Sequence, residues 1–254
     1  MIPKVIHYCW FGGNPLSKEA KQCIDSWRKY CPDYEIKEWN ESNFDLNSCT
    51  YIMEAYQAKK WAFVSDYARF WILYHYGGLY FDTDVEVIKP MDDLIEKGSF
   101  MGEEAGLPDN NSECNPGLGL AAAPGLGLYR EILDYYEHQH FLNPDGSNNL
   151  LTVVERTTEI LKLHGFKGDG SIEEVDGVLI YPPEYFCPMN YRTGKITITK
   201  NTRSIHHYSA TWQSSYDQFK TKLQHVLGRT LTEKIIGLKN ILKRKSINAG
   251  DMKY

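Results

Sequence analysis

Hydrophobic residues recur along the chain with two different periods. Short apolar runs over residues 4–11 and 34–39 predict two β-strands. Between them Ala20, Ile24, Trp27 and Cys31 repeat at helical spacing, which predicts an amphipathic helix that begins near Ser17. A strand, a helix and a strand in this order favour a parallel sheet covered by helices.

The same pattern predicts most of the remaining elements. Helices are expected over 50–58 and 61–75, and the second is apolar on nearly every side, which indicates a buried helix that ends at Gly77-Gly78. Further strands are expected over 79–81, 85–88, 100–103, 119–123, 178–181, 196–199 and 203–208, and further helices over 128–140 and 149–164. We therefore expect one α/β domain over residues 1–214.

The C-terminal segment has a pattern of its own. Leu231, Ile235, Leu238 and Leu242 repeat at helical spacing among basic residues, so 215–254 is expected to be a basic amphipathic helical tail. Such a helix suits contact with an anionic membrane surface, and equally suits packing on the body or on a second subunit.

Charge and cysteine content limit the possible functions. The formal charge is -5 although residues 220–245 hold eight Lys or Arg and one acid, so the rest of the chain is strongly acidic and nucleic acid is not an expected partner. The six cysteines include no Cys-x-x-Cys pair and are expected to be reduced. Without an apparent signal peptide or membrane span, we expect a cytoplasmic protein, or one peripheral on the inner face of the membrane.

Acidic residues follow the predicted strand 79–81. Asp82 and Asp84 are two residues apart, and strand alternation would point both carboxylates to the same side. Paired carboxylates suit Mn²⁺ or Mg²⁺ with open positions for phosphate oxygens. The alternative is a pair of surface turn residues.

Other candidates surround this pair. Asp66 and Arg69 lie among apolar residues on one predicted helix, so they form either a structural ion pair or a contact to a ligand. Trp10 precedes Gly12-Gly13 and is either a core residue or a stacking surface. One of His206 and His207 could reach a metal ion, whereas Asn115 reads locally as a turn residue.

Two functions other than metal-assisted chemistry on a bound diphosphate also fit parts of the sequence pattern. An apolar strand that ends in Asp-x-Asp also suits a phosphohydrolase with Asp82 as nucleophile, but that function leaves Trp10 and the Asp66/Arg69 helix without roles. A non-catalytic nucleotide-sugar-binding module is the second rival. Neither Gly-x-Gly-x-x-Gly at a helix start nor Gly-x-Ser-x-Gly is present, so a Rossmann site and a nucleophile elbow are not indicated.

Four motifs follow one another along the chain: Ile2–Gly12, Ser65-Asp66-x-x-Arg69, Gly77-Gly78-x-Tyr80-x-Asp82-x-Asp84, and His206-His207 with Thr211-Trp212. Taken together, they resemble glycosyltransferase family thirty-two, the DXD-containing capsular polysaccharide and Och1-like sugar transferases. They are also similar to the glucosyltransferase domain of large clostridial toxins. Thr211 departs from the serine that is usual before this tryptophan.

The resemblance implies a GT-A-type nucleotide-diphospho-sugar transferase fold with a mostly parallel central sheet flanked by helices. It implies a manganese-dependent (or magnesium-dependent) hexosyltransferase with a nucleotide-sugar donor, expected to be a UDP-sugar, and a saccharide or lipid-linked saccharide acceptor. Retention of configuration and a role in bacterial surface polysaccharide (capsule) synthesis are further expectations.

The resemblance also implies roles for individual residues. The expected catalytic residues are Asp66, Arg69, Asp82 and Asp84. The expected metal ligands are Asp82, Asp84, His206 and His207. The expected donor-binding residues are Tyr8, Trp10, Asn43, Ser65, Asp66, Arg69, Tyr80, Asp82, Asn115 and Trp212.

Overall fold

A computed structural model describes residues 1–105, 112–191 and 193–209. The chain divides into two compact units, and Met1–Met189 with Thr197–Tyr208 form the first, which holds every helix and strand named below. The second unit includes Asn190–Ile196, where the Asn190 N–H donates to the Lys195 carbonyl at 2.9 Å. The predicted tail 215–254 lies outside the described residues.

The predicted strand–helix–strand opening is confirmed. Strand β1 (Val5–Cys9) and strand β2 (Glu35–Trp39) pair in parallel, and helix α1 (Lys18–Tyr30) connects them. The Ser17 hydroxyl accepts a hydrogen bond from the Ala20 N–H at 3.0 Å and caps the first turn of α1.

The buried helix is also confirmed. Helix α2 (Thr50–Gln57) is followed by α3 (Trp61–Tyr76), which ends directly before strand β3 (Gly78–Tyr80). Gly77 has φ +64° at this junction, and a Cβ there would lie 2.6 Å from Cδ of Pro124. Only glycine allows both the left-handed backbone and the close approach, so it sets where the helix stops.

The remaining elements follow in chain order. They are β4 (Val85–Val87), α4 (Asp92–Ile95), β5 (Ser99–Glu104), β6 (Glu113–Cys114), β7 (Leu120–Ala122), α5 (Gly127–Glu137), α6 (Val153–Leu163), β8 (Glu173–Val175), β9 (Val178–Tyr181), α7 (Pro183–Phe186) and β10 (Ser204–His206). The strand predicted over 196–199 is wrong, because the Thr199 N–H donates to the Thr202 hydroxyl in a local turn instead of joining a ladder.

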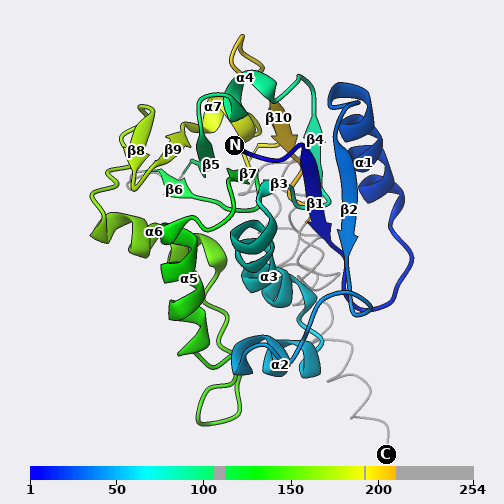
Figure 1. Cartoon of the computed structure of the whole chain (residues 1–254), viewed down its shortest axis with the longest axis vertical. Helices are drawn as coiled ribbons and strands as arrows, with labels where there is room; N and C mark the ends of the chain where they lie inside the picture. The colour runs from blue at the N-terminus through cyan, green and yellow to red at the C-terminus, as the bar shows by residue number, and fades with distance from the viewer. Residues whose placement is uncertain (106–111, 192, 210–254) are drawn as a thin grey trace, which may run out of the picture. The chain divides into compact units, whose positions relative to one another are not determined.

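The central sheet is mixed and has the order β2-β1-β3-β7-β5-β9-β8, with β6 paired to β5. Five of the eight strands that the structure describes in it run in one direction, and β6, β7 and β8 run the other way. Strands β4 and β10 form a separate antiparallel pair and lie side by side in Figure 1. The predicted α/β class with a mostly parallel sheet is confirmed.

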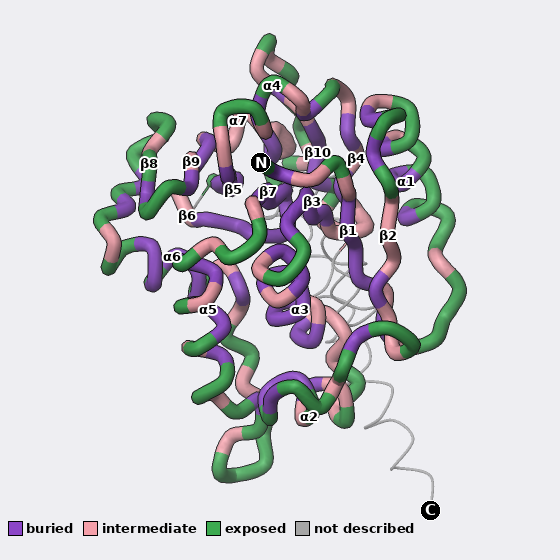
Figure 2. Tube along the Cα trace, viewed as in Figure 1, coloured by how far each residue is buried: buried purple, intermediate pink, exposed green. Residues whose placement is uncertain are grey.

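Apolar side chains of the strands alternate between two cores. Leu79 and Phe81 pack in the core shared with α1 and β4, whereas Tyr80 between them packs in the core shared with α2, α3 and α5. Figure 2 shows α3 as mostly buried. Because Asp82 is two residues after Tyr80, it emerges on the α3 side.

The structure also bears on the cysteines and on the apolar character of the helices. All six cysteines lie in the described part of the chain, where each is buried and unpaired. Among the helices that the structure describes, none combines the length and the apolar character that crossing a bilayer requires.

Candidate functional site

Asp82 and Asp84 lie beyond the end of β3, in the connection to β4. The Val85 N–H donates to the Asp82 carbonyl at 3.0 Å, which closes a tight turn over 82–85. The two acids are therefore turn residues and not strand residues. In this turn Asp82 contacts Arg69 of α3, and Asp84 contacts His206 of β10.

Asp82 is held by two side chains from the α3 side of the sheet. The Tyr80 hydroxyl donates to its Oδ1 at 3.0 Å, and the guanidinium of Arg69 reaches both carboxylate oxygens, Nη2 to Oδ1 at 3.3 Å and Nη1 to Oδ2 at 3.5 Å. The Asp82 side chain keeps 29% of its surface exposed. Tyr80 and Arg69 therefore orient the carboxylate from the α3 side, and its exposed part is accessible to a ligand.

Arg69 connects Asp82 to Asp66. Its Nη2 also lies 2.9 Å from Oδ1 of Asp66, its Nε donates to the Ser65 carbonyl at 3.1 Å, and its guanidinium lies 5.1 Å from the centre of the Tyr80 ring. Both members of the Asp66–Arg69 pair are buried. The pair is therefore a structural ion pair that borders the partly exposed carboxylate of Asp82, and a contact to a ligand stays a prediction.

The loop after β6 closes the other side of Asp82. The Asp82 N–H donates to the Gly117 carbonyl at 3.1 Å, and the Gly117 N–H donates to Oδ1 of Asn115 at 2.7 Å. A Cβ on Gly117 would lie 2.1 Å from Oδ2 of Asp82. Asn115 is held in turn by Oε2 of Glu104, which accepts from its Nδ2 at 2.8 Å.

Asp84 faces the C-terminal strand. Nε2 of His206 lies 3.3 Å from Oδ1 of Asp84, and both side chains are largely buried. His207 points elsewhere, because its Nε2 lies 2.9 Å from Oε2 of Glu86. Of the two expected histidine ligands, His206 is the one that reaches the DXD acids, since strand alternation turns its neighbour away.

Burial shifts the acidity of these groups. Desolvation raises the pKa of Asp66 to about 7 although Arg69 opposes the rise. Desolvation likewise raises the pKa of Asp82, again against the Arg69 charge. For His206, burial alone would lower the pKa, but the Asp84 carboxylate outweighs it and raises the pKa well above the usual value.

The donor set around Asp84 suits a divalent ion. In the described residues no group of three or more His, Cys, Asp and Glu forms a closed metal cluster. The buried Nδ1 of His206 has no hydrogen-bond partner among the described residues, while its Nε2 faces Oδ1 of Asp84. A carboxylate, a second carboxylate nearby and an imidazole fit Mn²⁺ that keeps open positions for phosphate.

Three of the expected donor-binding residues, Tyr8, Trp10 and Asn43, form their hydrogen bonds with residues outside the Asp82–Asp84 centre. Tyr8 is buried and its hydroxyl donates to Oε2 of Glu38 at 2.6 Å. The Asn43 amide is used within its own turn, where Nδ2 donates to the Glu38 carbonyl at 2.9 Å. Trp10, at the end of β1, is partly buried and its Nε1 donates to the Asn14 carbonyl at 2.7 Å.

Of the two rings, that of Trp10 is partly exposed, whereas that of Tyr8 is buried against Trp27, so Trp10 is the better candidate for stacking on a base. Ser65 contributes through its carbonyl, since its hydroxyl donates to the Ala62 carbonyl at 2.7 Å. Thr211 and Trp212 lie outside the described residues.

Three residues of the site were missed by sequence reasoning: Glu104, Gly117 and Tyr208. The Tyr208 ring lies 4.2 Å from that of His206, and its hydroxyl donates to Oε2 of Glu104 at 3.3 Å. Only the Pro-Gly pair before Leu118 hinted at a tight loop. Glu104 is distant in sequence from both of its partners, so no local pattern could reveal it.

Part of the chain is similar to known glycosyltransferases. Residues 17–101 match the family model described as a glycosyltransferase sugar-binding region containing a DXD motif. That segment runs from α1 through Asp66, Arg69, Asp82 and Asp84 to β5.

Two curated relatives are from Schizosaccharomyces pombe. Inositol phosphoceramide mannosyltransferase 1 is 32% identical over 150 residues, which is 55% of this chain and 45% of the relative. Inositol phosphoceramide mannosyltransferase 3 is 32% identical over 101 residues, 37% of this chain and 27% of the relative. The chain thus spans less than half the length of these relatives.

Solved glycosyltransferase structures are also similar. The PaToxG glycosyltransferase is 22% identical with a TM-score of 0.44, over 64% of this chain and 69% of that one. A glycosyltransferase involved in the glycosylation of the major capsid of PBCV-1 is 11% identical with a TM-score of 0.46, over 85% of this chain and 97% of that one. Residues 17–101 are therefore similar to the sugar-binding region of glycosyltransferases that contains a DXD motif.

Proposed function

We propose that the protein is a metal-dependent hexosyltransferase that uses a nucleotide-diphosphate sugar. The observation that carries the proposal is the turn over 82–85, which joins Asp82, bound to the buried Arg69, to Asp84, bound to His206. The Asp82 end of this turn suits contacts to sugar hydroxyls, and the Asp84 end suits a cation beside a diphosphate. Both ends lie in the segment that matches the sugar-binding family.

Loss of the nucleoside diphosphate is the demanding part of the reaction, because negative charge grows on the leaving group. Asp84 and His206, with Asp82, would hold Mn²⁺ or Mg²⁺, and such an ion supplies Lewis-acid stabilisation of that charge. No strong base from the chain is then required, so positioning of the donor dominates the rate.

The donor sugar would be oriented by side chains that are already fixed. Asp66 is oriented by Arg69, and Asp82 by Tyr80 and Arg69. Asn115 is fixed by Glu104 and Gly117. Because none of these groups must reorganise when the sugar binds, their hydrogen bonds to sugar hydroxyls cost little ordering entropy.

The relatives suggest which sugar and acceptor to try first. Two of them carry the name inositol phosphoceramide mannosyltransferase, so mannose is the first sugar to test and a lipid-linked acceptor is favoured over a free saccharide. Retention of configuration, a UDP-linked donor and a role in bacterial surface polysaccharide synthesis stay predictions from the family resemblance. We also propose a place on the inner face of a membrane, with the basic tail as the contact.

The test is turnover of a panel of UDP- and GDP-linked hexoses with Mn²⁺, followed by release of the nucleoside diphosphate. We expect Asp84→Ala to lower turnover by about 100-fold or more while the protein still folds, with some loss of stability because His206 loses its buried partner. The matched control is Glu86→Gln, which removes a nearby carboxylate that pairs with His207 outside the centre.

The outcomes separate the rival functions. Full turnover by Asp84→Ala would reject the metal-dependent mechanism. Hydrolysis of a generic phosphoester that depends on Asp82, without use of any nucleotide sugar, would favour the phosphohydrolase. Metal-dependent hydrolysis of a nucleotide sugar in the absence of an acceptor would exclude a purely binding module.

A further inference from the structure

Glu104, the last residue of β5, accepts hydrogen bonds from two different segments of the site. Its Oε2 accepts from Nδ2 of Asn115 at 2.8 Å and from the Tyr208 hydroxyl at 3.3 Å. Asn115 follows β6 and Tyr208 follows β10, so the two donors come from distant parts of the chain. One carboxylate oxygen therefore connects these two segments.

The Asn115 side leads to Asp82. Oδ1 of Asn115 accepts from the Gly117 N–H at 2.7 Å, and the Gly117 carbonyl accepts from the Asp82 N–H at 3.1 Å. The Asn115 side chain is thus bound at both ends of its amide, since Glu104 binds its nitrogen and Gly117 binds its oxygen. An amide bound in this way has a fixed plane, and its second N–H has a defined direction.

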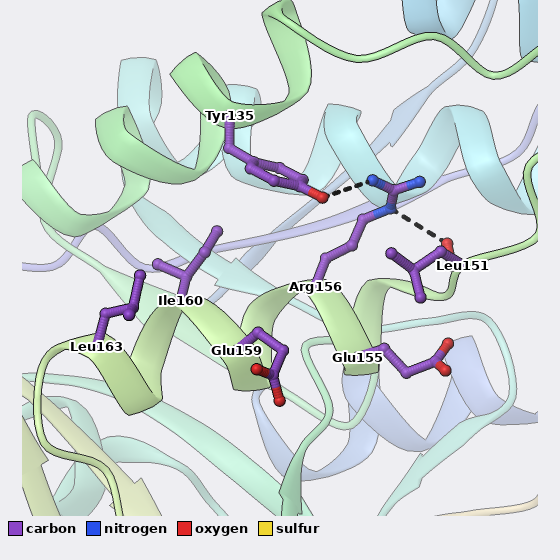
Figure 3. Close-up of a pocket in the computed structure, with 7 residues that line it drawn as sticks. All are labelled: Tyr135, Leu151, Glu155, Arg156, Glu159, Ile160 and Leu163. Carbon is purple, nitrogen blue, oxygen red and sulfur yellow. Dashed lines mark hydrogen bonds between the residues drawn. The ribbon is translucent and has the colours of Figure 1, made fainter.

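The loop that carries Asn115 has a fixed support. Cys114, directly before it, donates from its N–H to the Thr158 hydroxyl on α6 at 2.9 Å, and both residues are buried. Figure 3 shows Arg156 of α6 extending toward α5, where its Nη1 donates to the Tyr135 hydroxyl at 3.0 Å. Helix α6 therefore joins the Asn115 loop to α5.

The Tyr208 side leads to Asp84. The centre of the Tyr208 ring lies 4.2 Å from that of His206, and Nε2 of His206 lies 3.3 Å from Oδ1 of Asp84. Tyr208 has φ +50°, a left-handed backbone that bulky residues rarely adopt. Such a conformation persists only where the surroundings hold it, and the Tyr208 hydroxyl contacts Glu104 and lies 2.8 Å from Sγ of Cys187.

The two sides form a closed circuit of contacts. Asp82 and Asp84 belong to one turn, and a series of contacts leads from each of them to Glu104. The Asn115 side is supported by α6, whereas the Tyr208 side contains the strained backbone. Because Glu104 contacts both sides, it transfers the fixed position of Asn115 to Tyr208 and, through the ring contact, to His206.

We propose that Glu104 is a positioning residue that holds Asn115 for the donor sugar and Tyr208 against His206, so that one carboxylate orients both the sugar side and the cation side of the site. This inference rests on the proposed function in one respect, namely that the donor sugar binds at Asn115 and a divalent cation at Asp84 and His206. Glu104 acts on both through its neighbours.

The first test compares Glu104→Ala with Glu104→Gln, because glutamine keeps an oxygen that can accept both hydrogen bonds but carries no charge. The donor is the nucleotide sugar that the wild type turns over fastest in the panel above. We expect Glu104→Ala to lower kcat/KM for this donor, and to weaken Mn²⁺ binding to the donor-free protein, each about tenfold or more. Glutamine should restore most of both. Loss of the paramagnetic resonance signal of free Mn²⁺ measures its binding.

The matched control is Glu113→Ala. Glu113 is the register partner of Glu104 on β6, so this variant removes a carboxylate from the same strand pair and leaves the hydrogen bonds of Glu104 in place. Both readouts should stay near wild type. Unchanged values in Glu104→Ala, an effect on one readout alone, or an equal loss in the control would overturn the proposal. A glutamine variant as impaired as the alanine variant would also overturn it, because the effect would then belong to the charge and not to the hydrogen bonds.

A second measurement needs neither donor nor cation. Urea unfolding gives the coupling between Asn115→Ala and Tyr208→Phe, once in the otherwise native chain and once in the presence of Glu104→Ala. We expect non-additive losses of stability in the first background and additive losses in the second, because the two side chains share Oε2 of Glu104. Additive losses in both backgrounds, or equal coupling in both, would overturn the proposal.

The failure of this inference is distinguishable from failure of the proposed function. A wild type that neither turns over a nucleotide sugar nor binds Mn²⁺ would reject the proposed function. The coupling in urea unfolding would still decide whether Glu104 joins the Asn115 and Tyr208 segments.

Discussion

The position of the Asp82 carboxylate depends on three neighbouring residues. Tyr80 and Arg69 hold its carboxylate from the α3 side, and Gly117 leaves it room on the other. A side chain as small as a methyl group at Gly117 would occupy the space of Oδ2, so this glycine is required for space and not for backbone conformation.

We predict that Gly117→Ala lowers donor turnover by about 10- to 100-fold, because the added Cβ displaces Asp82 from the geometry that Arg69 and Tyr80 impose. The fold should survive, since the Asp82 side chain is partly exposed and can turn outward. Steady-state kinetics with an unfolding curve checks both parts.

The matched control is Gly127→Ala at the start of α5, where an added Cβ meets nothing within 4 Å. It should retain activity and gain up to about 1 kcal/mol of stability. Activity of Gly117→Ala equal to that of the control would contradict the steric role.

At this scale the sequence predicted the residues whose chemistry is visible locally. Asp66 and Arg69 are three residues apart on one helix, and Asp82 follows an apolar strand. Glu104 and Tyr208 escaped prediction because each contacts partners far away in the chain, and an isolated glutamate or tyrosine carries no local signal.

At the scale of elements, His7 on β1 connects this strand to β2 and to Gly77, the residue before β3. It is buried on β1, its Nε2 lies 3.0 Å from the Gly77 carbonyl, and its Nδ1 accepts from Nε1 of Trp39 on β2 at 3.0 Å. These partners assign the neutral tautomer with the proton on Nε2. A second proton would put two N–H donors face to face at Trp39.

This arrangement predicts a pH dependence of stability. Burial lowers the pKa of His7 from 6.5 to about 4, so between these pH values the unfolded chain binds a proton that the native protein does not. The free energy of unfolding should therefore fall as pH falls through this window, by about 3 kcal/mol in all from His7. Urea unfolding across the window measures it.

The control is His7→Gln, which can keep hydrogen bonds to Gly77 and Trp39 but does not titrate. Acids such as Asp66 titrate in both proteins, so the difference between the two pH profiles isolates His7. Parallel profiles for the two proteins would show that His7 is not held neutral.

The sequence predicted whether a segment is a helix or a strand better than it predicted where each one begins and ends. The helix over 61–75 and the strand over 178–181 were found because their apolar patterns are continuous. The strand over 196–199 was mispredicted, since the Thr199 N–H donates to the Thr202 hydroxyl in a local turn. Strands β6 and β8 were missed because they are short and owe their pairing to β5 and β9.

At the scale of the whole molecule, charge is divided between an acidic body and a basic segment. Residues 220–245 hold eight Lys or Arg and one acid, while the chain as a whole carries -5. This segment lies outside the described residues, so its role is a prediction from sequence.

We expect the full chain to bind vesicles that contain phosphatidylserine, with about 1 kcal/mol for each Lys or Arg near the surface, and to be released by salt. Replacing Lys239, Lys243, Arg244 and Lys245 with Gln should weaken binding. Vesicle sedimentation measures both effects.

The matched control replaces four exposed basic residues of α1 with Gln: Lys18, Lys21, Arg28 and Lys29. It removes the same charge from the body and should leave binding intact. Equal binding to neutral phosphatidylcholine vesicles, or an equal loss in the control, would argue against a contact through the tail.

The sequence by itself determined the α/β class, the opening strand–helix–strand unit, the buried α3 and the family motif, because hydrophobic periodicity and closely spaced acids are local properties. Only the tertiary structure decided which histidine reaches Asp84, that the two acids lie in a turn, and that Glu104 and Gly117 contact the site. Those outcomes depend on strand order and on contacts between distant segments, which arise only when the chain packs.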